Sequence, residues 1–239
     1  RLALSLVLTL GFVIIEAIAG FISNSLALLT DAAHNFTDVI ALGLSWYALR
    51  ISSQPAHAGK TYGYHRVGIL VALVNSTTLI LIAPGIFYAA WHRFLAPPVV
   101  DAPILIGVGI VAFIINAVTA WLVHKGSDHD LNLRSTFVHL MGDVLSTIGA
   151  VIAGVVIFFT QWNWLDPIVS VLIGALILWN AWGILRQTIH ILLESTPENI
   201  DIQNMLDDLL TVEGVRGVHD LHVWSINENL RVLSAHVMT

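Results

Sequence analysis

The sequence predicts a polytopic α-helical membrane protein that continues into a small α+β domain outside the membrane. The chain of 239 residues is 56% hydrophobic and 11% charged, with a mean hydropathy of +0.81, whereas a soluble domain carries about 25% charged residues. The apolar residues gather in long windows, and acidic residues concentrate after the last window. These features argue against an ordinary soluble globular protein.

The apolar windows have the length of membrane-spanning helices, which need roughly 20 apolar residues. We expect six such helices, near residues 2–22, 26–50, 66–92, 103–124, 134–160 and 165–191. Segments with polar residues, proline or glycine separate the windows, as is typical of breaks between helices. The chain has no cysteine, which excludes disulfide bonds and thiolate metal ligands.

Basic residues predict the orientation of these helices. Six spans place both termini on one side of the membrane. Only Arg93 falls near the other side, whereas seven basic residues fall on the side of the termini: Arg1, Arg50, Lys60, Arg66, Lys125, Arg134 and Arg186. Lys and Arg are enriched in cytoplasmic loops, so the termini are predicted to be cytoplasmic.

Residues 195–239 differ in composition from the rest of the chain. They carry seven acidic residues against two arginines and so hold −5 of the net charge of −6. The spacing of apolar residues in "NIDIQNMLDDLLTV" predicts a helix that Asp201 caps, and "GVHDLHVWSI" and "LRVLSAHVM" predict a strand hairpin. Helix–strand–strand leaves one sheet face uncovered, so we expect the chain to stop inside this cytoplasmic domain.

Ionisable side chains inside the predicted spans indicate a functional site, because a charge at the bilayer centre costs about 2.5–3.5 kcal/mol on insertion scales. "HNFTDVI" and "HLMGDVL" repeat the pattern His-x-x-x-Asp-Val. Positions i and i+4 share one helix face, and two such helices supply two nitrogens and two oxygens, a tetrahedral set that suits zinc. The predicted ligands are His34, Asp38, His139 and Asp143.

A purely structural explanation of these pairs has to be weighed. One His–Asp pair inside a membrane is equally well explained by a hydrogen bond between helices. Two pairs with the same spacing and apolar flanks favour metal binding. Both pairs lie well inside their spans, where transporters hold their substrate, so the pattern favours a metal ion that passes through the protein.

Several motifs resemble the cation diffusion facilitators, especially the bacterial zinc exporters of that family. They are "NSLALLTDAAHNFTD", "TYGYHR", "NLRSTFVHLMGD", "DPIVSVLIG" and "VHDLHVW". The resemblance covers essentially the whole chain. It implies a six-helix transport domain over residues 1–192 and the start of a ferredoxin-like cytoplasmic domain over 193–239. It also implies a homodimer in the bacterial inner membrane.

The resemblance assigns further roles. His34, Asp38, His139 and Asp143 correspond to the transport ligands, and the two histidines resemble the zinc-selective branch. His219 and His236 match positions of a second, cytoplasmic metal site whose remaining ligands lie beyond residue 239. Zn²⁺ is the expected substrate, with Cd²⁺ and Co²⁺ as further candidates and protons as the counter-ion. The expected partners are the metal ion, the lipid bilayer and a second copy of the chain, and no nucleic acid.

The chain also departs from the family pattern. Gly68 stands where many members have a glutamate, so any role of that glutamate is absent. Only "HKGSDHD" stands where eukaryotic relatives carry a histidine-rich loop, which favours a bacterial protein.

Four more ionisable residues leave alternatives open. Asp31 either orients the His34 imidazole or caps a helix turn, and Glu16 could face a water-filled route. His57 and His65 lie in a loop where some relatives bind a second zinc ion, although solvated loop histidines explain them as well.

The predicted mechanism follows from ligand protonation. Zinc needs neutral imidazole and ionised carboxylate, so protons and zinc displace each other. Histidine titrates near neutral pH, and an inward proton gradient would therefore drive zinc export. The alternatives are an intramembrane zinc metalloenzyme, which would need an open coordination position, and a divalent-cation channel or sensor.

Overall fold

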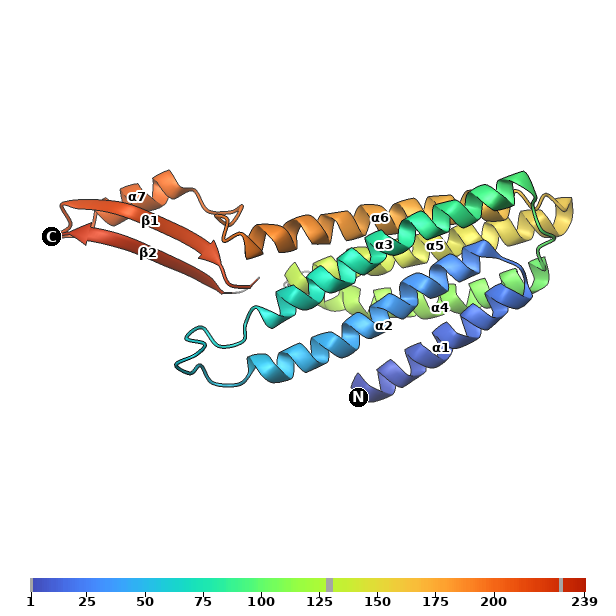
Figure 1. Ribbon diagram of the computed structural model, residues 1–239, viewed down its shortest axis with the longest axis horizontal. Coiled ribbons are helices and arrows are strands. Elements are labelled where there is room, and N and C mark those ends of the chain that lie inside the picture. The colour runs from blue at the N-terminus through green and yellow to red at the C-terminus, as the bar shows by residue number, and fades with distance from the viewer. Residues whose placement is uncertain (1, 128–130, 228–229) are drawn as a thin grey trace. The chain divides into compact units, whose positions relative to one another are not determined.

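The computed structural model describes residues 2–127, 131–227 and 230–239 (Figure 1). Its elements are α1 (Leu2–Ile22), α2 (Leu26–Ser52), α3 (Val67–Leu95), α4 (Ala102–Ser127), α5 (Leu131–Thr160), α6 (Leu165–Leu192), α7 (Ile202–Leu210), β1 (Gly217–Ser225) and β2 (Arg231–Met238). The helices α1 to α6 confirm the predicted helical windows, with ends that shift by a few residues. Arg1, the last three residues of "HKGSDHD" (128–130) and residues 228–229 lie outside the described residues.

Four of the described helices are long and apolar enough to cross a membrane: Val67–Leu95, Ala102–Trp121, His139–Thr160 and Leu165–Leu192, with mean hydropathies of 2.1 to 2.3. In α1 the apolar part with described side chains, Thr9–Ile22, is shorter than a span. In α2 the polar residues around His34 lower the hydropathy. The predicted number of six membrane spans therefore stays a prediction.

Internal contacts divide the chain into two compact units. The first comprises Arg1–Gly43 and Thr77–Trp182, and the second comprises Leu44–Ser76 and Gly183–Thr239. The division passes through α2, α3 and α6, because each of these helices contributes one end to each unit. The predicted domain boundary between residues 192 and 193 is a different kind of division and stays a prediction.

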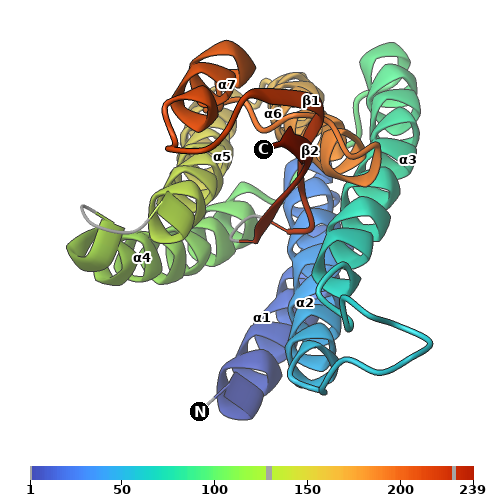
Figure 2. The same ribbon diagram turned by 90° about the vertical axis from the view of Figure 1, so that its left-hand side faces the viewer.

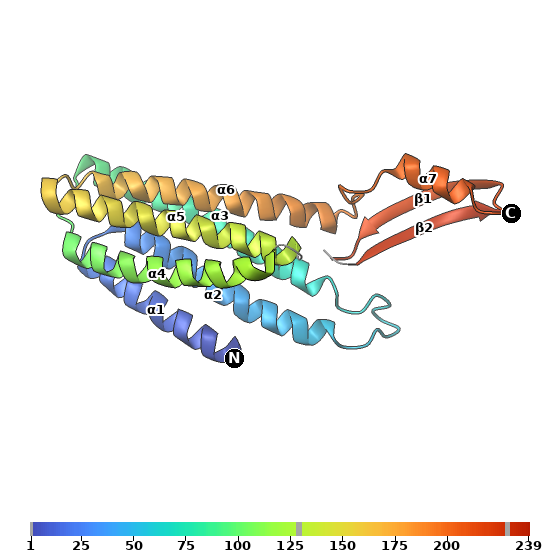
Figure 3. The ribbon, with the colours of Figure 1, turned by 180° about the vertical axis from the view of Figure 1, so that it is seen from behind.

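Within the first unit, α4 and α5 lie side by side over most of their lengths (Figure 3). Glycines permit this close approach. A Cβ atom on Gly109 would lie 2.8 Å from the side chain of Val151, and one on Gly154 would lie 2.9 Å from that of Ile106. Small residues at helix contacts are typical of membrane proteins, where close van der Waals packing holds helices together.

The surface of these helices is apolar. Phe21, Leu81, Phe159 and Trp179 are more than 70% exposed, although large apolar side chains are usually buried in soluble proteins. The buried core is built largely from alanine and branched aliphatic residues, among them Ala27, Ala150, Leu28 and Ile157. Lipid-facing helices have this distribution, because hydrocarbon chains solvate large apolar side chains and small residues let the helices approach.

A buried carboxylate connects the ends of several helices in the first unit. Asp166, at the start of α6, is fully buried and accepts hydrogen bonds from Ser25 Oγ at 2.6 Å, Leu26 N at 2.7 Å and Ala27 N at 3.2 Å. Arg93 of α3 lies 3.3 Å from the same carboxylate. Asp166 thus satisfies N–H groups that the first turn of α2 leaves without partners, and the N-terminal dipole of α2 favours its negative charge.

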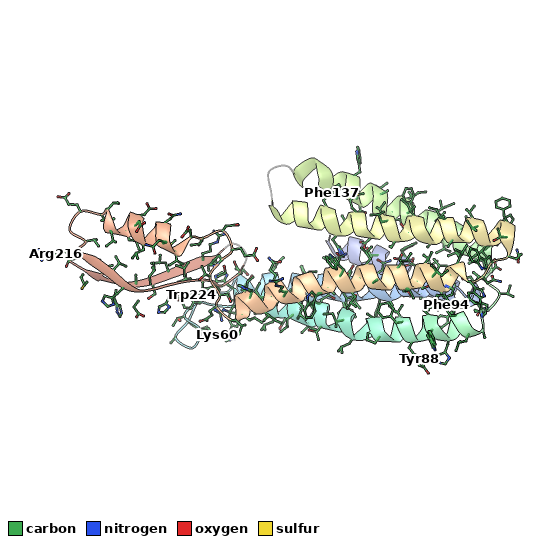
Figure 4. The ribbon with its side chains drawn as sticks, turned by 90° about the horizontal axis from the view of Figure 1, so that it is seen from above. Lys60, Tyr88, Phe94, Phe137, Arg216 and Trp224 are labelled. Carbon is green, nitrogen blue, oxygen red and sulfur yellow. The ribbon has the colours of Figure 1, made fainter. Side chains whose placement is uncertain are left out.

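The loops at this end add further contacts. Asp101 N donates to Ser23 O at 2.9 Å, and Val100 N donates to Asn163 Oδ1 at 3.0 Å. Phe94, labelled in Figure 4, contacts the edge of Trp164 with ring centroids 6.3 Å apart. The start of α2 is therefore fixed to α3, α6 and the loop before α4. This matters because α2 carries His34 and Asp38.

The second unit contains the predicted helix and strand hairpin. Asp201 caps α7 by accepting from the backbone N–H groups of Gln203 and Asn204, as predicted. Strands β1 and β2 pair antiparallel, with α7 beside β1 (Figure 2). No residue of β2 is buried, and Leu233, Val237 and Met238 are between 45% and 53% exposed. The expectation of an uncovered sheet face agrees with this exposure.

Candidate metal centre

The structure brings the two predicted His–Asp pairs together. Facing imidazoles and carboxylates form crosswise contacts: His34 Nε2 lies 3.1 Å from Asp143 Oδ1, and His139 Nε2 lies 3.2 Å from Asp38 Oδ2. Within each helix, His34 Nε2 lies 3.5 Å from Asp38 Oδ2, and His139 Nε2 lies 3.7 Å from Asp143 Oδ2. The helices α2 and α5 each supply half of the cluster, because one helical turn separates the histidine from the aspartate.

The spacing fits a tetrahedral ion. Zinc binds imidazole and carboxylate ligands at about 2.0–2.1 Å, which places neighbouring ligand atoms about 3.3 Å apart. One ligand atom from each of the four residues lies within 4.8 Å of the other three, and the closest contacts already have the tetrahedral spacing. Two nitrogens and two oxygens suit zinc better than calcium or magnesium, which prefer oxygen shells.

The cluster is largely shielded but has one more accessible side. His34 and Asp143 are 6% and 8% exposed, whereas the side chains of Asp38 and His139 are 30% and 34% exposed. An ion could therefore enter from the side of Asp38 and His139, whereas His34 and Asp143 are shielded from solvent. Within the part of the chain that the structure describes, no other group of three or more His, Asp or Glu side chains has this spacing.

The surroundings of the cluster resolve the open question about Asp31. Neither predicted role holds in the structure. Asp31 Oδ1 accepts from Ser146 Oγ at 3.0 Å, and Asp31 Oδ2 accepts from Asn35 Nδ2 at 3.4 Å. His34 Nδ1, the atom that Asp31 would have to orient, is buried without a hydrogen-bond partner among the described residues. The capping role belongs to Asp166, which the sequence did not single out.

Glu16 extends this polar region onto α1. Its side chain is fully buried, and its Oε2 accepts from Asn35 Nδ2 at 3.1 Å. Asn35 and Ser146 were not predicted as part of the site. Their position suggests how they could have been found, since each lies within one helical turn of a predicted ligand and is polar in an apolar segment.

The loop histidines of the second unit stay outside the cluster. His57 is exposed, and its Nε2 lies 3.4 Å from Tyr64 Oη. His65 lines a cavity of about 350 Å³ together with Arg66, Glu194 and Trp224, the last of which is labelled in Figure 4. Neither histidine belongs to a group with metal-ligand spacing, so a second zinc site in this loop stays a prediction.

His219 and His236 are paired across the hairpin, as predicted. They are opposite each other in the register of β1 and β2, and their rings contact edge to face with centroids 5.2 Å apart. A bulge between His219 and His222 puts Asp220 in a left-handed conformation with φ of 56°. Asp220 Oδ1 then lies 2.9 Å from His222 Nε2, and Asp220 Oδ2 lies 3.7 Å from His236 Nδ1. The hydrogen bond from His222 holds the pKa of the Asp220 carboxyl below its usual value.

Comparison with known proteins identifies the class to which this fold and site belong. Residues 2–193 match the family model of the cation efflux transmembrane domain, and residues 197–239 match that of the cation efflux protein cytoplasmic domain. The chain belongs to the cation efflux family, the cation diffusion facilitators. The predicted family is thereby confirmed. The protein is an integral membrane transporter and not an enzyme.

Individual relatives agree with this assignment. The chain is 39% identical over 239 residues to the "Cadmium, cobalt and zinc/H(+)-K(+) antiporter" of Bacillus subtilis (strain 168), covering 99% of this chain and 77% of the relative. It is 39% identical over 242 residues to the "Zinc transporter ZitB" of Pectobacterium atrosepticum, covering 100% of this chain and 75% of the relative. It is 36% identical over 239 residues to the "Zinc transporter ZitB" of Escherichia coli (strain K12), covering 99% and 76%.

Proposed function

We propose that the protein exports Zn²⁺ from the cytoplasm in exchange for protons, and that the ion binds to His34, Asp38, His139 and Asp143. The convergence of two imidazoles and two carboxylates between α2 and α5 carries this proposal. The names of the relatives support it, since they describe zinc transport and, for the Bacillus protein, exchange for protons and potassium ions. Cd²⁺ and Co²⁺, which that name also includes, are further candidate substrates.

The crosswise contacts explain the exchange. Each histidine Nε2 lies at hydrogen-bond distance from a carboxylate of the other helix, and a proton has to lie between the nitrogen and the oxygen in each contact. Zn²⁺ needs the Nε2 lone pair and the ionised carboxylate, so the ion takes the place of these protons. Return of protons from the other side of the membrane releases the ion.

The proposal includes an arrangement in the membrane. We infer that α1 to α6 all span the bilayer of the bacterial inner membrane, with both termini in the cytoplasm. The excess of Lys and Arg on the side of the termini supports this orientation. His34 and Asp38 of the metal centre are among the polar residues that lower the hydropathy of α2, and such residues are tolerated in a span where they face a binding site.

The C-terminal residues 193–239 are proposed to form part of a ferredoxin-like cytoplasmic domain through which two copies associate. The match to the cation efflux cytoplasmic domain and the observed helix–strand–strand order support this. His219 and His236 are proposed as ligands of a second metal site there. Their side chains are in ring contact, and a metal would need further ligands besides them.

The experiment that tests the function is zinc flux into proteoliposomes. With an acidic lumen, zinc is expected to enter against its own gradient, to saturate with zinc concentration, and to stop when an ionophore collapses the pH gradient. A channel would conduct zinc only down its gradient and would not respond to the ionophore in this way. Absence of zinc movement above that of empty liposomes would overturn the proposal.

A further inference from the structure

A second ionisable group lies beside the metal centre. Glu16 of α1 and Asp31 of α2 are 0% and 3% exposed, and their carboxyl groups lie within hydrogen-bonding reach of each other. The proposed exchange uses neither of them as a ligand. Two adjacent buried carboxyl groups therefore require a separate explanation, because an ionised carboxylate without a cation is costly to bury.

The hydrogen bonds around this pair are asymmetric. The Asn35 amide donates to both carboxyl groups, to Glu16 Oε2 at 3.1 Å and to Asp31 Oδ2 at 3.4 Å. Ser146 Oγ donates to Asp31 Oδ1 at 3.0 Å. Glu16 Oε1 is buried and receives no hydrogen bond from an amide, hydroxyl or basic group among the described residues. The Glu16 carboxyl group also lies within hydrogen-bonding reach of the Asp31 carboxyl group, and the two groups share the Asn35 amide.

The charges nearby do not compensate the pair. Within the described chain, none of the ion pairs includes Glu16 or Asp31. The charged group that faces Glu16 is Asp31, and beyond it His34 of α2 and Asp143 of α5 act electrostatically on Asp31. Two carboxyl oxygens form a hydrogen bond only if one of them carries a proton, because carboxylates are acceptors alone.

From this geometry we propose that Glu16 is a proton-binding site of the transporter. It holds one proton in its hydrogen bond to Asp31 while the metal centre is empty, and it loses that proton when Zn²⁺ binds. The O–H bond of Glu16 breaks, the proton leaves to water on the side to which the centre is open, and the carboxylate charge remains. The double positive charge of the ion beyond Asp31 favours the ionised pair. This inference rests on the proposed exchange of zinc for protons.

The test measures protons released per zinc bound by the full chain in detergent, with a pH indicator in weak buffer. Glu16→Gln keeps the shape of the side chain but cannot ionise. It is expected to bind one zinc at the centre and to release about one proton fewer than the unmodified protein. Glu16→Asp is expected to restore part of the release. Glu198→Gln, the same change at an exposed residue of the second unit, is expected to leave the release unchanged.

The outcomes separate this inference from the proposed function. If the unmodified protein binds zinc and releases no protons, the exchange itself is wrong. If it releases protons and Glu16→Gln releases the same number, the exchange stands and Glu16 is not a proton site.

Infrared difference spectroscopy of the unmodified protein does not depend on how the variants fold. Zinc is expected to remove a C=O band of a protonated carboxyl group, and a spectrum without this loss would overturn the inference.

Discussion

Two buried carboxylate regions of the first unit differ in how well their charges are compensated. Asp166 accepts three hydrogen bonds from Ser25 and the first turn of α2 and pairs with Arg93. Among the described residues around the metal centre, the hydrogen bonds of four carboxyl groups involve two imidazoles, one amide and one hydroxyl; these are the carboxyl groups of Glu16, Asp31, Asp38 and Asp143.

The difference teaches that burial of a charge does not by itself indicate function. A buried carboxylate whose oxygens are all satisfied holds a structure together, since removing it leaves N–H groups and a cation without partners. A group of carboxylates with too few donors needs mobile positive charge, either protons or a metal ion. We therefore interpret the first region as a structural anchor and the second as the proposed site of exchange.

The largest expected effect concerns transport at the second region. Replacing His34, Asp38, His139 or Asp143 by Ala removes one of the four proposed ligands. Zinc transport should fall by more than about 100-fold, since the loss of outer-shell partners alone costs about 10–100-fold in metal affinity or activity. Flux into proteoliposomes with matched amounts of inserted protein measures this. Glu213→Ala, at an exposed carboxylate of the second unit, is the control, and normal flux in Asp38→Ala and Asp143→Ala would refute the ligand assignment.

The next effect concerns stability and should differ in sign between the two regions. Asp166→Ala leaves Arg93 and the start of α2 without their acceptor, and we expect a loss of about 3–5 kcal/mol. Asp143→Asn removes one of several neighbouring negative charges and should leave stability unchanged or higher. Thermal unfolding in detergent without metal compares the two. An equal loss in both variants would contradict the distinction between anchor and exchange site.

A smaller effect concerns the choice of metal. His34→Asp changes the ligand set to one nitrogen and three oxygens, and imidazole favours zinc over harder ions. Competition between metals during transport should then shift several-fold towards cadmium or manganese. If the preference for zinc is unchanged, the geometry of the site selects the ion, and the ligand identity does not.

The smallest effect lies outside the membrane, at Asp220. The hydrogen bond from His222 is the main reason that the pKa of Asp220 is lowered in the folded protein. The contribution of Asp220 to stability is therefore present above the pKa that Asp has in the unfolded chain, about 3.9. It is lost as the pH falls through the folded pKa. Carboxyl NMR of the labelled protein should show Asp220 titrating nearer its usual value in His222→Ala. Identical titrations in both proteins would contradict the assigned cause.

The sequence predicted the helices and the two His–Asp pairs that the structure brings together, because both depend on local pattern. Apolar windows determine the helices, and the spacing of four residues places His34 beside Asp38 and His139 beside Asp143. The contacts of Asp166 with Ser25 could not be predicted, because they join residues 141 positions apart and depend on how the helices pack. The position of Glu16 depends on the rotation of α1 relative to α2, which hydrophobicity alone does not determine. The bulge at Asp220 interrupts the alternation expected of a strand.

The central claim is that Zn²⁺ and protons exchange at the four residues between α2 and α5. The most direct test records zinc entry and proton exit simultaneously in the same proteoliposomes, for the unmodified protein and for Asp143→Asn. We expect the two fluxes to rise together in a fixed ratio in the unmodified protein and to be lost together in the variant. Zinc entry without proton exit in the unmodified protein, or coupled fluxes that persist in Asp143→Asn, would contradict the claim.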